Sequence, residues 1–69
     1  MVAEWYFLVS IMTGAFDPQT GWQHVKRTEY VAASEQACWV LQEGTVQAIK
    51  ERLKPGEGAV VTGCQVRGR

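Results

Sequence analysis

The alternation of hydrophobic and polar positions predicts three β-strands and one helical segment in the order β-β-α-β. The first predicted strand, residues 5–12, is unusual because it is apolar on both faces. Its two faces are Trp5, Phe7, Val9 and Ile11 on one side, and Tyr6, Leu8, Ser10 and Met12 on the other. A small sheet with one helical layer buries only one such face. The other face must be covered by a partner, by a second copy or by the chain's own loop.

Turn residues separate the first strand from a second one. Gly14 is expected to end the first strand, and residues 14–21 form a hairpin loop in which Asp17 and Pro18 start the turn. The second strand covers residues 22–31. Neither of its faces is cleanly apolar, which predicts an edge strand or an exposed ribbon whose charges discourage aggregation.

A helix and a third strand complete the predicted fold. Ser34 is a good N-cap. The helix either ends at Gly44 and restarts at Thr45, or passes through Gly44 as one helix; we favour the kinked or broken form. The last strand covers residues 59–67. The fold class is α+β, a small three-stranded, mainly antiparallel sheet with one helical layer, and residues 1–69 form a single domain.

Composition narrows the classes of function. Seven basic and seven acidic side chains give a net charge of zero, without the basic excess typical of nucleic-acid binding. The apolar run at residues 5–12 is short beside the about 20 residues that cross a bilayer, and no basic residue precedes it. We therefore expect a cytoplasmic protein with no membrane association. In that compartment Cys38 and Cys64 are expected to be free, buried thiols.

Residue types that carry chemistry are sparse. His24 is the only histidine, and no carboxylate pair, phosphate-binding loop or nucleophile elbow is present. Two cysteines and one histidine cannot complete a four-ligand zinc site. The sequence therefore predicts a protein that is not an enzyme and that uses no metal or cofactor.

Aromatic side chains outside the expected core suggest binding instead. Trp39 falls on the flank of the sheet-facing helix stripe, and Phe16 stands in a polar loop. Tryptophan in particular is enriched where binding energy concentrates. The candidate partner contacts are Tyr6, Phe16, Trp22, Tyr30 and Trp39.

Two alternatives stay open. Aromatic and basic groups interleave along one face of the second strand, as in platforms that stack single-stranded nucleic acid. These residues are Trp22, His24, Lys26 and Tyr30. The other alternative is a structural homodimer in which Tyr6, Leu8 and Met12 form a contact between two sheets.

Residues 30–37, with the sequence Tyr-Val-Ala-Ala-Ser-Glu-Gln-Ala, form the junction between strand and helix. This junction, together with chain length and element order, resembles small phage and prophage proteins, including some anti-CRISPR inhibitors. The resemblance implies a protein of the host cytoplasm that blocks a larger host complex by occupying its surface. It assigns no individual functional residue.

Overall fold

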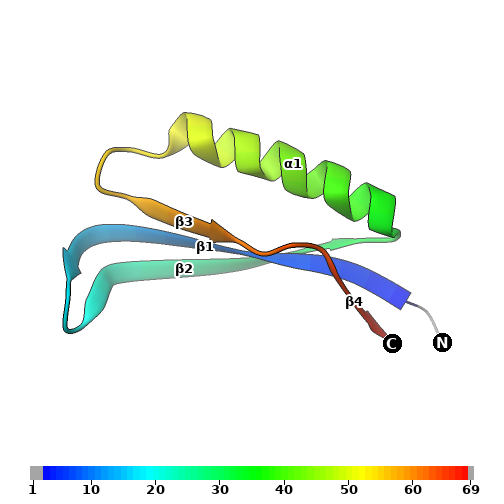
Figure 1. Cartoon of the computed structure of the whole chain (residues 1–69), viewed down its shortest axis with the longest axis horizontal. Helices are drawn as coiled ribbons and strands as arrows, with labels where there is room; N and C mark the ends of the chain where they lie inside the picture. Colours follow the sequence, from blue (N-terminus) through cyan, green and yellow to red (C-terminus); the bar gives the residue numbers. More distant parts are fainter. Residues whose placement is uncertain (1–2, 69) are drawn as a thin grey trace.

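The computed structural model describes residues 3–68 as one sheet with one helix lying on it (Figure 1). The elements are β1 (Ala3–Asp17), β2 (Gly21–Ala32), α1 (Glu35–Arg52), β3 (Gly58–Val61) and β4 (Gln65–Gly68). The predicted α+β class and the β-β-α-β order are confirmed. The predicted third strand is present as two short strands, so the sheet has four strands rather than three.

β1 is the central strand, and every other strand pairs with it in antiparallel fashion. β2 lies along one side, with Leu8 opposite Glu29. β3 and β4 follow one another along the other side, where Val61 pairs with Val9 and Gln65 with Tyr6. Because paired residues point to the same face, this register decides which side chains the helix covers.

The last strand breaks at residues 62–64, where the prediction of one strand over residues 59–67 was wrong. Thr62 still bonds β1, since its backbone N–H donates to Leu8 O and its Oγ1 accepts from Leu8 N, both at 2.9 Å. Gly63 lies beneath the Trp39 ring, so that a Cβ there would fall 3.3 Å from Trp39 Cη2. Cys64 is bonded to the helix. At these three residues the hydrogen-bond ladder with β1 is interrupted, which separates β3 from β4.

The hairpin between β1 and β2 is longer than predicted. β1 does not end at Gly14 but continues to Asp17, with a register irregularity between Thr13 and Phe16. Gly14 has a φ of +83°, which suits a bulge position. The predicted turn start is confirmed, because Asp17 Oδ1 accepts from Gln19 N at 2.8 Å.

α1 is a single helix, so the favoured break at Gly44 was wrong. The predicted N-cap is confirmed, since Ser34 Oγ accepts from Ala37 N at 3.2 Å. Thr45 does not cap a second helix. Its hydroxyl donates instead to Leu41 O at 2.8 Å, within the same helix. One glycine costs about 1 kcal/mol in a helix, which a helix of 18 residues tolerates.

The core is small, and it lies between the helix and one face of the sheet. Phe7, Val9 and Cys38 are the only buried hydrophobic residues among those described. Tyr30 stacks on Phe7, with ring centroids 5.1 Å apart and planes inclined by 10°. The predicted imbalance of β1 is therefore confirmed: Phe7 and Val9 are enclosed, whereas Leu8 on the opposite face is 39% exposed.

The molecule is flat and exposes much surface for its length. Its dimensions are 43 × 25 × 12 Å, and its radius of gyration of 14.1 Å exceeds the about 11 Å typical of this chain length. The accessible surface is 5147 Å². A compact monomer of this mass has about 4,300 Å². The surplus of about 800 Å² follows from the flat shape.

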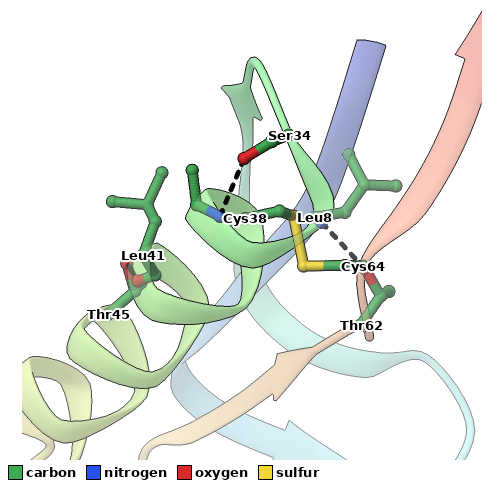
Figure 2. The surroundings of a disulfide bond; sticks show 8 residues. Leu8, Ser34, Cys38, Leu41, Thr45, Thr62 and Cys64 are labelled. Carbon is green, nitrogen blue, oxygen red and sulfur yellow. Dashed lines mark hydrogen bonds between the residues drawn. A yellow bond between two sulfur atoms is a disulfide. The ribbon is translucent and has the colours of Figure 1, made fainter. Parts of the chain in front are cut away.

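A disulfide joins Cys38 on α1 to Cys64 ahead of β4 (Figure 2). The expectation of two free thiols was wrong. That expectation came from the assumed compartment, whereas the fold brings the two Cα atoms to 6.2 Å, within the range that a disulfide spans. The bond fastens the N-terminal half of α1 to the segment between β3 and β4, at the edge of the sheet opposite β2.

Candidate functional site

No element within residues 3–68 covers the face of the sheet opposite α1 (Figure 1), and this face is the candidate site. We call it the open face and define it by the side chains that alternate away from the helix. Its apolar members are Tyr6, Leu8 and Met12 on β1, Val25 and Val31 on β2, and Val60 on β3. Val25, Val31 and Val60 are half exposed or close to it, at 50%, 45% and 56%. Arg27 and Glu29 share this face and lie between Val25 and Val31 on β2, so the exposed aliphatic groups are interrupted by charge.

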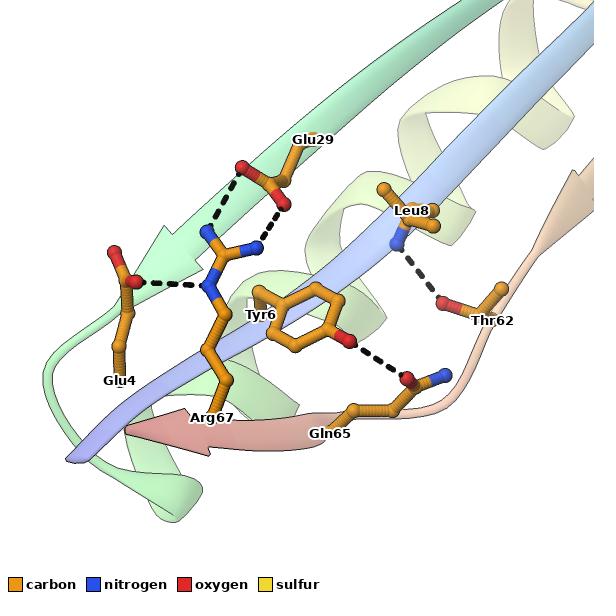
Figure 3. A network of polar contacts seen from close by, with 7 residues as sticks. All are labelled: Glu4, Tyr6, Leu8, Glu29, Thr62, Gln65 and Arg67. Carbon is orange, nitrogen blue, oxygen red and sulfur yellow. Dashed lines mark hydrogen bonds and ion pairs between the residues drawn. The ribbon is translucent and has the colours of Figure 1, made fainter. Parts of the chain in front are cut away.

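One end of the open face is closed by Arg67 of β4, which reaches across the sheet (Figure 3). Its Nε donates to Glu4 Oε2 at 2.9 Å, and its Nη1 and Nη2 donate to the two oxygens of Glu29 at 2.7 and 3.0 Å. The guanidinium lies 4.4 Å from the centre of the Tyr6 ring. The hydrogen bonds, first to Glu29 and then to Glu4, hold the pKa of Arg67 above its ordinary value. This end is therefore an ordered polar border.

Aromatic residues lie at the other end, near the hairpin. Phe16 and Trp22 face one another across the strand pair, with ring centroids 5.3 Å apart. Trp22 and Met12 both lie against Gly58, since a Cβ there would fall 3.3 Å from Trp22 Cζ2 and 3.2 Å from Met12 Cε. Phe16 is 58% exposed, whereas Trp22 is partly buried. The structure thus brings two of the candidate contact residues together.

The other candidate contacts lie apart from this pair. Tyr6 is on the open face, but the Arg67 guanidinium covers its ring, and its hydroxyl donates to Gln65 Oε1 at 3.0 Å. Tyr30 is on the helix side, packed on Phe7. Trp39 is 43% exposed on α1, above Gly63. The five residues therefore do not form one surface.

Three of the residues considered for nucleic acid lie on the helix side of β2, away from the open face. His24 and Lys26 are exposed and, by their pairing with Thr13 and Ile11, point to the helix side of β2. Tyr30 shares that side, but its ring is stacked on Phe7 and partly buried. A stacking platform needs open aromatic faces, so this arrangement gives the nucleic-acid alternative no support of its own.

A groove of about 650 Å³ runs between α1 and the sheet. Ile11 and Tyr30 form its floor, and Leu41, Ala48 and Ile49 of the helix form its wall. The groove exists because the helix packs loosely, with Val40 and Leu41 65% and 39% exposed. It is apolar and shallow, and the sequence pattern gave no indication of it.

The residues missed by sequence reasoning are Val25, Val31 and Val60. They lie opposite Met12, Tyr6 and Ser10, so the strand register alone groups them. Val25 and Val31 follow the alternation of a strand, but the charged residues at positions 26, 27 and 29 between them obscured this apolar pattern.

Within residues 3–68, no cluster of three or more histidine, cysteine or acidic residues lies close enough to hold a metal ion. The helix of the described region is too polar to cross a membrane. Comparison with known proteins gives no family: no family model, curated protein or solved structure matches the chain.

Proposed function

We propose that the chain is a protein-binding module and that a partner protein docks on the open face. The observation that carries the proposal is the exposure of four aliphatic side chains on one face, Leu8, Val25, Val31 and Val60, which no described element covers. Exposed apolar patches of several hundred Å² mark interaction sites in soluble proteins.

The borders of the face also suit a protein partner. Interfaces combine an apolar centre with a polar rim, and aromatic anchors are enriched among their strongest contacts. Here the Arg67 network supplies an ordered rim, while Phe16 and Trp22 supply aromatic groups at the opposite end. Tyr6, Tyr30 and Trp39 remain predicted contacts of lower rank, because each is engaged within the fold or lies on another side.

Inhibition of a larger host complex by steric occupation is the form of this proposal that the resemblance to phage inhibitors implies. A cytoplasmic location follows from the same resemblance. The bond between Cys38 and Cys64 argues against this location, since structural disulfides persist mainly in oxidising compartments.

The test compares one substitution on two faces. Val60→Glu places a carboxylate on the open face, and Val40→Glu makes the same change at a similarly exposed site on α1. Each variant and the native chain is immobilised, and proteins captured from a lysate are quantified. We expect a protein bound by the native chain and by Val40→Glu whose recovery falls about tenfold or more with Val60→Glu, because docking would desolvate an unpaired charge.

Thermal unfolding of each variant shows that its fold is retained. Equal recovery of every captured protein by all three chains would contradict the proposal. So would a loss confined to Val40→Glu, which would place binding on the helix and the groove beside it.

A further inference from the structure

We propose that two copies of this chain associate through the free edge of β2, which joins their sheets into one antiparallel sheet with a twofold axis at Thr28. The partner in this interaction is therefore a second copy of the chain. The inference does not depend on the proposed function, since the contact is made by the backbone edge of β2, although Val25 and Val31 on that edge also belong to the open face.

The edge is long and accessible. β2 has 12 residues, and its side chains from Gln23 to Glu29 are exposed. On its inner side β2 pairs with β1, and no other strand of the described region pairs with its outer side. Such an edge presents a row of backbone donors and acceptors that a further strand can use.

The backbone geometry shows which residues of β2 offer these groups. The N–H and C=O of Leu8 both point to the β3 side, because they bond Thr62. Neighbouring residues of a strand point their backbone groups to opposite sides, so those of Val9 point to β2 and meet its partner Thr28. The backbone groups of Arg27 and Glu29 consequently point outward, to the free edge.

One register makes this edge complementary to itself. With Thr28 opposite Thr28 of the second copy, Arg27 lies opposite Glu29, and Val25 lies opposite Val31. Each of these pairs occurs twice because of the symmetry, and each joins residues whose backbone groups face outward. Opposite charges and aliphatic pairs directly across a ladder both stabilise a sheet. Arg67 already orients the Glu29 carboxylate from within its own chain.

Neighbouring registers lack this complementarity. Shifting the second strand by two residues places Arg27 opposite Arg27 in one direction and Glu29 opposite Glu29 in the other. Like charges directly opposite one another destabilise a ladder. A shift by a single residue would set outward backbone groups against inward ones. The charges on β2 therefore oppose most edge pairing, as they do in protected edge strands, and favour this one register.

The twofold axis lies perpendicular to the sheet, because antiparallel edges meet with their faces continuous. Both helices then lie on one side, and both open faces lie on the other. Val25 of each copy meets Val31 of the other on the side of the open faces, with the Arg27–Glu29 pairs between these two contacts. The contact is isologous, so it closes at a dimer and does not propagate.

The first experiment measures molar mass by sedimentation over a range of concentrations. We expect the native chain to form a dimer. Arg27→Glu places like charges opposite each other twice and should weaken the dimer about tenfold or more. Lys50→Glu, an equal charge change on the exposed face of α1, should leave it unchanged. A native chain that stays monomeric at all concentrations would overturn the proposal.

The second experiment tests the register. In the proposed register Thr28 lies opposite Thr28 of the second copy. This is a non-hydrogen-bonded pair, in which the two Cα atoms lie about 4.5 Å apart. That distance allows a disulfide, so mild oxidation should convert Thr28→Cys to a covalent dimer on a non-reducing gel. Lys26→Cys, on the same face of β2, should stay uncrosslinked, because residue 26 lies opposite Tyr30 of the second copy and not opposite another residue 26. A dimer that resists Arg27→Glu and gives no crosslink through Thr28→Cys must use another surface, which also refutes the proposal.

Discussion

The Cys38–Cys64 disulfide should contribute a large share of the stability of this protein. The perturbation is reduction of the bond, or its removal by the paired substitutions Cys38→Ala and Cys64→Ala. The two cysteines are 26 residues apart in the sequence. Closing a loop of that length lowers the entropy of the unfolded chain enough to stabilise the fold by about 3.5 kcal/mol at 25 °C.

Such a loss matters because little else holds the helix. Cys38 is the only buried residue of α1, and the described core contains only Phe7 and Val9 besides it. In a domain of this size each kcal/mol shifts the melting temperature by roughly 4 to 8 °C. Reduction is therefore expected to lower the melting temperature by about 15 to 25 °C, and small domains with so few buried side chains commonly depend on such crosslinks.

Thermal unfolding followed by circular dichroism, with and without a phosphine reductant, measures the effect. The paired alanine variant is the control: it should melt near the reduced native protein and should not respond to the reductant. A fall of less than about 5 °C on reduction would refute the reasoning. It would mean that packing of the helix on the sheet, rather than the crosslink, supplies the stability.

Two further predictions concern glycines. Gly44→Ala should stabilise the protein by about 1 kcal/mol in urea unfolding, because α1 passes straight through this position and a Cβ there meets nothing within 4 Å; a loss of stability would point to a bend at Gly44 in solution. Gly14→Ala should destabilise more than Gly21→Ala in the same assay. Both positions have positive φ, which costs about 1 to 2 kcal/mol, but only the Cβ at Gly14 would collide, at 2.7 Å from Gln23 Cβ; equal losses would show that Gln23 moves aside.

The elements governed by local chemistry could be predicted from the sequence. Ser34 caps the helix and Asp17 starts the turn because each bonds a backbone group two or three residues away. The two-sided apolar pattern of β1 likewise depends only on the alternation of a strand, and it led to the correct expectation of one uncovered face.

The features that were missed depend on contacts between distant segments. The split of the last strand follows from Thr62 bonding Leu8 and from the helix drawing Cys64 away, neither of which a local pattern reveals. The disulfide was rejected because of an assumed compartment, although the fold determines whether two cysteines meet. The aliphatic members of the open face on β2 and β3 became visible only when the register placed them beside Met12 and Ser10.

The central place of β1 has a consequence for synthesis of the chain. β1 is made before the other strands, yet one of its two sides pairs with β3 and β4, which follow the helix in the sequence, as in the pairing of Ala3 with Gly68. The hairpin with β2 can form early, but the other side of β1 stays without its hydrogen-bond partners until β3 and β4 have been made. Pairings this distant in sequence slow folding. During that time the apolar β1 has an unpaired edge, which makes it prone to aggregate. The yield of soluble protein should therefore depend on how long this incomplete sheet persists. Binding by chaperones during synthesis, or expression at lower temperature, should raise that yield.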